Sequence, residues 1–284
     1  YLLELKKYQF DIIGTDINPN APGKNLCNKF YHVAYDDLDG LIEVGVNENF
    51  TCDDKVFTVS AQFAHKGAAH FSNKFDIKYP KESNIDLCLD KTLFYKRFQK
   101  LNIPIPETSF ISDKDELINA VSNSNKNTNY YLKSDFSKNP NYVYRFNINN
   151  LKIDEMFWGR DRYLQNHYIL QKEFFGESIR INIYGDRFNV FQFDPMKKMT
   201  NKKDKIIKLG VIESLASFIK DQHLEKWLIK FDIIIDKENY VVLDVGLDPP
   251  FRMVNESKLQ NINFAKHYVK HYLQQQVEYP ESLD

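Results

Sequence analysis

The stretch Phe231-Asp-Ile-Ile-Ile-Asp-Lys-Glu-Asn-Tyr-Val-Val-Leu-Asp-Val245 has the pattern of two apolar strands joined by a short polar turn. Asp232 lies in the first strand and Asp244 in the second. If the strands pair in antiparallel fashion around the turn at 236–239, both carboxylates lie near the same end of the hairpin. An unpaired carboxylate among apolar neighbours is costly, so the pair requires a compensating cation.

Two kinds of cation fit that requirement. Mg²⁺ is commonly held by one or two carboxylates together with the phosphates of a nucleotide. A lysine or arginine side chain would instead form a buried salt bridge. The hairpin itself leaves both options open.

Two lysines upstream of the hairpin point to phosphate. Asp90-Lys91 begin a predicted helix over 90–101, which stops before Ile103-Pro-Ile-Pro106. Lys133 ends a predicted strand over 130–133 and enters a polar loop, where a lysine can meet phosphate oxygens as a compact charge. Either lysine taken alone is more often a solvated side chain.

The segment 171–183 contains a strand with a polar face. Arg180 and Asn182 share this face, because Ile179, Ile181 and Ile183 alternate with them. The face is either an ordinary water-facing surface or a wall that binds an acyl phosphate or a carboxylate.

In this order the segments resemble the ATP-grasp superfamily over nearly the whole chain. The first half is similar to carbamoyl-phosphate-synthetase-like ligases and the second to RimK-like ligases. The matching segments are the strand and loop at 11–19, the helix and prolines at 89–106, the strand at 131–133, the hinge at 168–175 with the following Arg180, and the pair Asp232 and Asp244.

The resemblance implies ATP and Mg²⁺ as cofactors and gives the residues roles. The nucleotide-binding set would be Lys91, Lys133, Gln171, Lys172, Glu173, Phe174 and Glu177. Within it the lysines at 91 and 133 would contact phosphates, the hinge backbone would meet adenine, and Glu177 would bind ribose. Lys133 and Arg180 would be catalytic, with Arg180 stabilising charge on the transferring phosphoryl group or on the acyl phosphate.

Three departures from the family pattern concern the loop and the metal site. The loop 134–142 contains no glycine, although the family's phosphate-covering loop is normally glycine-rich. Asp244 stands where the family has Glu, and Gly246 where it has Asn, which leaves Asp248 as a substitute metal ligand beside Asp232 and Asp244.

Arg252 follows the turn Asp248-Pro-Pro-Phe. It is a candidate for binding the substrate carboxylate or for forming a structural ion pair.

The expected fold is α/β and α+β. We predict an N-terminal Rossmann-like, pre-ATP-grasp domain over 1–88, a small central lid subdomain over 89–167 and a C-terminal antiparallel α+β domain over 168–284. The first part is expected to hold a parallel sheet, with a strand at 57–60 before a helix at 61–75. In the last part a helix over 208–229 interrupts the strands.

The implied function is an ADP-forming ligase that joins a carboxylate to an amine through an acyl phosphate, with an amino acid or small peptide as substrate. The alternatives are an ATP-binding regulatory protein that has lost activity and a small-molecule kinase. Both small-molecule substrates would be its partners, with a monomer and a homodimer both open.

The composition bears on the binding partners, the cysteine chemistry and the location of the protein. Lys and Arg number 38 and Asp and Glu 39, a balance that calls for neither nucleic acid nor a membrane surface as partner. Cys27, Cys52 and Cys88 form no metal-binding pair, and three cysteines give no disulfide framework. A reducing cytoplasm is the expected location.

Overall fold

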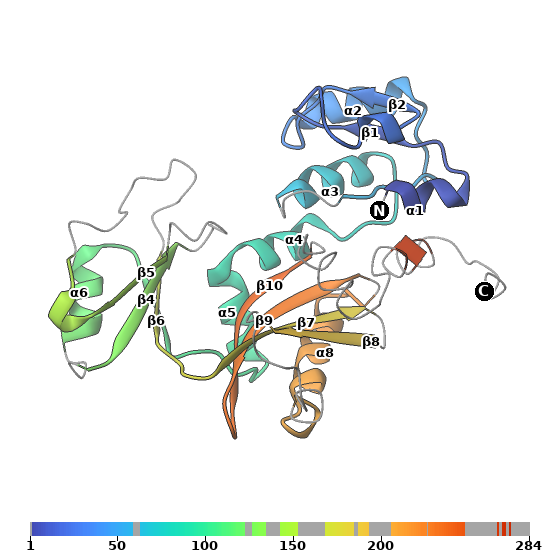
Figure 1. Cartoon of the computed structure of the whole chain (residues 1–284). Coiled ribbons are helices and arrows are strands. Elements are labelled where there is room, and N and C mark those ends of the chain that lie inside the picture. Colours follow the sequence, from blue (N-terminus) through green and yellow to red (C-terminus); the bar gives the residue numbers. More distant parts are fainter. Residues whose placement is uncertain are drawn as a thin grey trace.

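The computed structural model describes residues 2–58, 63–122, 127–134, 143–152, 168–184, 187–192, 206–225 and 227–247, and positions 266, 269, 270 and 273. Its elements form an N-terminal part, a middle sheet and a C-terminal sheet (Figure 1). Among the described residues, no helix is long and apolar enough to cross a membrane. The three cysteines are free thiols.

The N-terminal part has a small parallel sheet with helices beside it. Strands β1 (Ile13–Thr15) and β2 (Lys29–Tyr31) pair in parallel, as predicted. The surrounding helices are α1 (Leu2–Leu5), η1 (Lys6–Tyr8), η2 (Lys24–Leu26), α2 (Leu38–Asn47) and α3 (Ala64–Lys74). The strand predicted at 57–60 is wrong at 57 and 58, which lie in no strand, and 59–60 fall outside the described residues.

Two consecutive helices lead from this part to the middle sheet. The sequence did not indicate α4 (Glu82–Leu89), but α5 (Lys91–Lys100) confirms the helix predicted over 90–101. Asp90 caps α5 by accepting a hydrogen bond from the Leu93 N–H at 3.0 Å. Asn102, with a φ of 55°, ends the helical course before the prolines.

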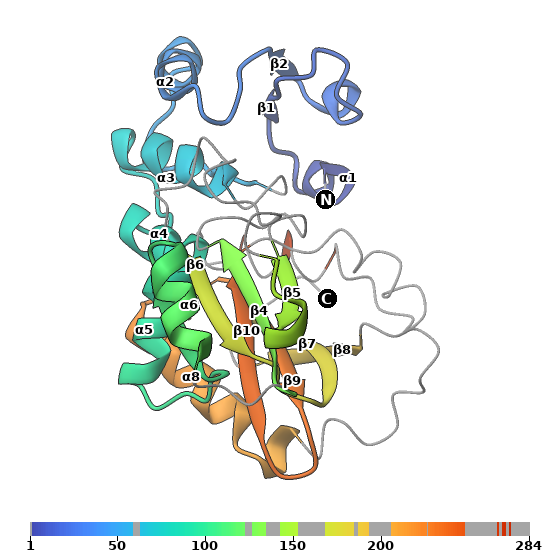
Figure 2. The same cartoon turned by 90° about the vertical axis from the view of Figure 1, so that its left-hand side faces the viewer.

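The middle sheet is antiparallel, in the order β3-β6-β4-β5. Its strands are β3 (Thr108–Ile111), β4 (Asn129–Ser134), β5 (Val143–Asn147) and β6 (Tyr168–Lys172), with helix α6 (Lys114–Ser122) and the short η4 (Ile148–Asn150). Alternate residues of β4 are buried, and Leu132 packs there with Leu117 of α6. Figure 2 shows α6 beside these strands.

The C-terminal sheet is also antiparallel, in the order β10-β9-β7-β8. It comprises β7 (Glu177–Tyr184), β8 (Arg187–Gln192), β9 (Ile229–Ile235) and β10 (Tyr240–Gly246), with helix α8 (Val211–Asp221) against it. The helix predicted over 208–229 is therefore wrong at its end. His223, with a φ of 52°, breaks the helix, and Ile229 already belongs to β9.

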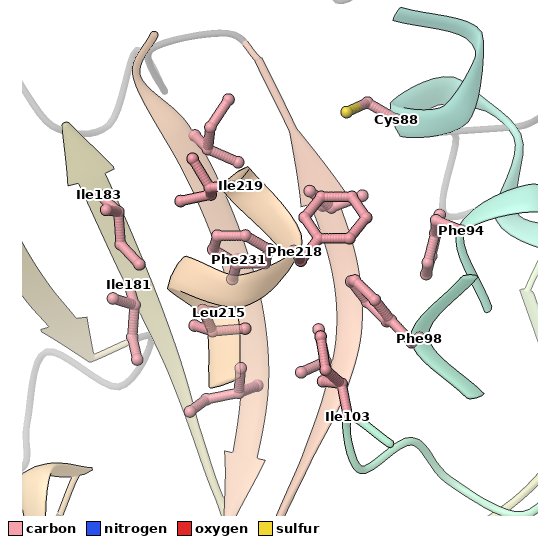
Figure 3. Close-up of a cluster of buried hydrophobic side chains, with 14 of the residues drawn as sticks. Cys88, Phe94, Phe98, Ile103, Ile181, Ile183, Leu215, Phe218, Ile219 and Phe231 are labelled. Atoms are coloured by element: carbon pink, nitrogen blue, oxygen red, sulfur yellow. The ribbon is translucent and has the colours of Figure 1, made fainter. Parts of the chain in front are cut away.

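The largest core joins α5 and α8 to the C-terminal sheet (Figure 3). The rings of Phe98 and Phe218 pack edge-on with their centroids 4.8 Å apart, and the centroids of Phe218 and Phe231 of β9 are 6.0 Å apart. At the rim, Arg97 of α5 pairs with Asp221 of α8. Helix α5 is thus part of the C-terminal core, although its residues fall within the predicted lid range.

The connection between the two sheets lies at 173–176. Strand β6 pairs with β3 and β4 in the middle sheet, although a division at 167/168 would assign it to the C-terminal domain. Strand β7 then begins the second sheet at Glu177. The predicted domain ranges remain a prediction. However, β6 belongs to the middle sheet although it lies in the predicted C-terminal range, and α5 packs on the C-terminal sheet although it lies in the predicted lid range.

We expect Phe98→Ala to lower the free energy of unfolding by about 3–5 kcal/mol, because it removes a fully buried ring from this core. Urea denaturation measures the change. Leu93→Ala on the same helix is the control, since Leu93 is 43% exposed and should cost little. Equal losses in the two variants would contradict the assignment of α5 to the core.

Candidate functional site

Strands β7, β9 and β10 place three charged residues in one row. Asp244 lies opposite Asp232, and Asp232 lies opposite Arg180. Directly opposed residues in antiparallel strands point to the same face of the sheet. The other face carries Ile179, Ile181 and their neighbours into the core. The row is therefore a polar stripe on the face away from α8.

Arg180 and Asp232 form a two-point salt bridge within this row. The Arg180 Nε donates to Asp232 Oδ1 at 2.6 Å, and Nη2 donates to Oδ2 at 2.8 Å. Both side chains are mostly buried, at 16% and 18% exposed. Of the two cations that the sequence left open for Asp232, the structure shows the arginine. The pair also offsets the repulsion between the opposed carboxylates of Asp232 and Asp244.

A bulge in β10 decides which face Asp244 occupies. Val242 lies opposite Ile233, but the next residue opposite β9 is Asp244, so Leu243 is the additional residue. Without it, Leu243 would lie opposite Asp232 and Asp244 would point into the core. The Val242 N–H donates to Pro104 O at 2.9 Å, and the Tyr95 hydroxyl donates to Leu243 O at 2.6 Å.

Lys133 approaches this row from the middle sheet. Its Nζ donates to Gln171 Oε1 at 2.7 Å, and the Gln171 Nε2 donates to Thr108 Oγ1 at 3.0 Å. The Tyr95 hydroxyl lies 3.3 Å from the same Gln171 oxygen. A lysine, a glutamine and a tyrosine from three elements therefore meet at one point, above the bulge of β10.

The charges of Lys133 and Asp244 influence one another. Burial lowers the pKa of Lys133 to about 8, and the carboxylate of Asp244 opposes that decrease. Burial, and secondarily the same carboxylate, raise the pKa of Tyr95. Gln171 accepts hydrogen bonds from Lys133 and Tyr95, and Tyr95 also donates to Leu243, the neighbour of Asp244, so Lys133 and Asp244 border one common site.

Lys91 belongs to the same region through its helix. It is the first residue of α5 and is only 7% exposed. Tyr95 lies four residues further on, so the two side chains share a helix face. That face meets Gln171 and Leu243, and the helix N-terminus adds a positive partial charge there. These features suit an anion.

The hinge side chains are held by the middle sheet. Glu173 accepts hydrogen bonds from Arg145 Nε at 2.8 Å, Asn129 Nδ2 at 2.7 Å and the Tyr131 hydroxyl at 3.0 Å. These donors, Arg145 above all, lower the pKa of the Glu173 carboxyl. Lys172 pairs with Glu107. These two side chains thus fix the hinge itself, so an adenine contact here would involve backbone atoms.

Some hinge backbone groups are already bonded. The Glu173 N–H donates to Asn129 O at 2.9 Å, and the Lys172 N–H donates to Glu107 O at 3.0 Å. Phe174 and Glu177 are half-buried. At Gly176 a Cβ would lie 2.6 Å from Ile235 O, so this crossing between the sheets requires glycine.

The residues present fit Mg²⁺ when a polyphosphate is bound. Asp232 and Asp244 offer hard oxygen ligands on one face, and Mg²⁺ takes one or two such carboxylates beside phosphate oxygens. Among the described residues, no group of three His, Cys, Asp or Glu side chains could hold a metal without added ligands. The predicted ligand Asp248 and the predicted substrate residue Arg252 lie outside the described residues.

Sequence reasoning missed three contributors to the site, namely Tyr95, Thr108 and Arg145. Tyr95 carried a usable signal, because it lies four residues after Lys91 on a predicted helix. Thr108 and Arg145 carried none, since their partners Gln171 and Glu173 are distant in sequence and meet them only through strand pairing.

No protein-family model and no curated protein sequence matches this chain. Its structure is similar to phosphoribosylglycinamide synthetase from Anaerococcus prevotii, with a TM-score of 0.69 and 17% identity over 98% of this chain and 71% of that one. It is also similar to L-amino acid ligase from Bacillus licheniformis, with a TM-score of 0.69 and 12% identity over 96% of this chain and 70% of that one. For D-alanine–D-alanine ligase from Bacillus anthracis the TM-score is 0.65 and the identity 12%, over 95% of this chain and 98% of that one. These likenesses confirm the expected fold class.

We expect Lys133→Met to raise the free energy of unfolding at pH 7, by on the order of 1–3 kcal/mol, because it removes a partly buried charge that has lost much of its hydration. Between pH 8 and the ordinary lysine pKa of 10.5, the unfolded wild-type chain holds the proton that the folded chain has lost. Wild-type stability therefore rises with pH in this window, and the advantage of the variant should shrink.

Urea denaturation at pH 7 and about 9.5 measures this difference. Lys172→Met on the adjacent strand β6 is the control, since that lysine is 48% exposed and should change stability little at either pH. A Lys133→Met variant that is less stable than the wild type at pH 7 would disprove the burial argument.

Proposed function

We propose that this chain, which has the ATP-grasp fold, uses ATP and Mg²⁺ to join a carboxylate to an amine. The observation that carries the proposal is the set of hydrogen bonds that links Lys133 of the middle sheet, through Gln171 and Tyr95, to Leu243, the residue before Asp244 in the C-terminal sheet. A cation on one wall and a carboxylate on the other suit a magnesium-bound polyphosphate between them. Two of the structurally similar proteins named above are ligases and one is a synthetase, which supports this reaction class.

In this proposal the two sheets hold different parts of ATP. The hinge backbone at 173–174 meets adenine and Glu177 the ribose, while Lys91 and Lys133 bind the phosphates. Asp232 and Asp244 would hold Mg²⁺, which supplies charge neutralisation on the phosphates when bound. Arg180, fixed by Asp232, offers its remaining donors to the transferring phosphoryl group.

The chemistry has two steps. A substrate carboxylate oxygen attacks the γ-phosphorus, the bond to the β-phosphate oxygen breaks, and ADP leaves with that electron pair. An uncharged amine then attacks the acyl carbon, inorganic phosphate leaves, and the amine loses a proton as the amide forms. Because water would hydrolyse the acyl phosphate, burial of Lys91 and Gln171 around the phosphates serves the reaction.

The substrates proposed are amino acids or small peptides. Two of the structurally similar proteins are named for amino-acid substrates, L-amino acid ligase and D-alanine–D-alanine ligase. We also infer a cytoplasmic location from the free thiols, and neither nucleic acid nor a membrane as partner from the balanced charge. A homodimer is compatible with this function.

A second candidate is an ATP-binding regulatory protein without ligase activity. The salt bridge of Asp232 to Arg180 favours it, because that carboxylate already has a cation. Gly246 favours it too, since it offers no side-chain ligand. ATP binding without release of ADP across a panel of amino acids and dipeptides would identify this function.

For the ligase, we expect Asp244→Asn to reduce ADP release by roughly 10²-fold or more, because it removes one ligand charge at the metal. Coupled-enzyme detection of ADP measures the rate. Glu238→Gln in the turn of the same hairpin is the control and should retain full activity, since it lies at the opposite end from the carboxylate row. Unchanged ADP release in Asp244→Asn would reject the metal assignment.

We expect Lys133→Ala to weaken ATP binding roughly tenfold or more, through loss of a charge-assisted contact to phosphate. Isothermal titration at pH 7 and about 9 gives the affinity. In the wild type the affinity should fall as the pH rises through about 8, because Lys133 then loses its charge. Lys133→Arg should bind equally at both pH values, and a pH dependence that persists in this variant would point to another group.

A further inference from the structure

Asn182 is a fully buried side chain on the polar face of β7. It is 0% exposed, and neither its amide nitrogen nor its amide oxygen has a hydrogen-bond partner among the described residues. It lies two residues beyond Arg180, so both side chains point to the same side of the sheet. Nothing within the described fold accounts for an amide at this place.

A buried amide without partners is unfavourable. Each unmade hydrogen bond costs the desolvation of the polar atom, and native structures contain few such atoms. An apolar residue would avoid this cost, as the isoleucines at 179, 181 and 183 do on the opposite face. A group from outside the chain that displaces what now covers Asn182 and bonds to both amide atoms would remove the cost.

The position of Asn182 along β7 indicates which molecule supplies that group. Counting from Gly176 at the hinge, Arg180 lies about 13 Å away, at ~3.3 Å per residue. A nucleoside triphosphate spans a similar length from base to terminal phosphate. Asn182 lies about 7 Å further along the strand. With the proposed ATP lying along β7 and its base at the hinge, a molecule that contacts Asn182 lies beyond the terminal phosphate, where the second substrate belongs.

The neighbours of Asn182 favour a ligand with a carboxylate. Lys230 of β9 lies directly opposite Asn182, and Gly246 of β10 lies opposite Lys230. Lys230 brings a positive charge to this second row, and Gly246 adds no side chain at its end. This second row lies beside the first one on the same face of the sheet. It contains a cation and an amide, whereas the first contains a cation and two carboxylates.

We propose that Asn182 binds the amine substrate and that this substrate is an α-amino acid with a free carboxylate. The amide Nδ2 donates to the carboxylate, with Lys230 adding charge, and Oδ1 accepts from the amino group. An α-amino acid carries its donor and its acceptor close enough together for one amide to bind both. The amino group then faces back toward Arg180 and the acyl phosphate. This inference rests on the ligase function proposed above.

Asn182→Leu tests this role, because leucine has a similar size and no polar atom to satisfy. The probes are the proteinogenic L-amino acids, measured by isothermal titration with and without magnesium and a non-hydrolysable ATP analogue. For the amino acid that binds the wild type best, we expect the variant to lose roughly tenfold or more in affinity. Affinity for the ATP analogue should remain unchanged, and the melting temperature should be equal or higher.

Matched ligands and a matched variant separate the explanations. The α-carboxamide of the same amino acid should bind the wild type more weakly and lose less on Asn182→Leu. Ser178→Ala, on the same face of β7 but on the hinge side of Arg180, should keep full amino-acid affinity. If Asn182→Leu melts at a lower temperature and keeps its amino-acid affinity, Asn182 holds internal structure or a water molecule and the proposal is wrong.

Two outcomes distinguish this proposal from the proposed function. If the wild type binds the ATP analogue but no free amino acid, the substrate assignment fails while an ATP-dependent reaction with other substrates survives. If the wild type binds amino acids through Asn182 but no nucleotide, the ligase function fails instead. Equal amino-acid affinities in the wild type and Asn182→Leu would reject the role of Asn182 in either case.

Discussion

One additional residue in β10 organises the candidate site. The bulge at Leu243 turns Asp244 to the polar face, where it lies opposite Asp232. Two hydrogen bonds hold the bulge, from the Val242 N–H to Pro104 O and from the Tyr95 hydroxyl to Leu243 O. Helix α5 and the prolines after it therefore do more than bury apolar surface. They set the register on which the carboxylate row depends.

The site contains groups that a chain selected for stability alone would lack. Lys133 is partly buried beside a neutral amide, and Asn182 is fully buried with both amide atoms unsatisfied. Desolvation of such groups lowers the stability of the ligand-free fold, and in the functions proposed above each would gain a partner when its ligand binds. The large core around Phe98 and Phe218 supplies the stability that offsets these costs.

Much of the fold was predictable because its signals are local. Asp90 and the prolines after 102 bounded α5, alternating isoleucines marked β7, and the three consecutive isoleucines after Asp232 marked β9. Helix α4 was not predicted from the sequence, because only Asp90 separates it from α5. The helix predicted to run to 229 was too long, since Leu224 and Leu228 continue a helical spacing that the backbone at His223 interrupts.

The site was less predictable than the fold. The bulge depends on Pro104 and Tyr95, which are distant in sequence from Leu243, so no pattern within β10 reveals it. The pairing of Arg180 with Asp232 follows from strand register alone. For the same reason the hairpin could not show by itself which cation compensates Asp232.

Helix α5 also places the two lysines on different supports. Lys91 is carried by a helix that belongs to the C-terminal core, while Lys133 extends from the middle sheet. Like charges on separate supports repel, and a multivalent anion between them reverses the sign of that force. In the proposed function, a triphosphate bound between the two lysines would draw the C-terminal core and the middle sheet together, and transfer of its γ-phosphoryl group would weaken that attraction.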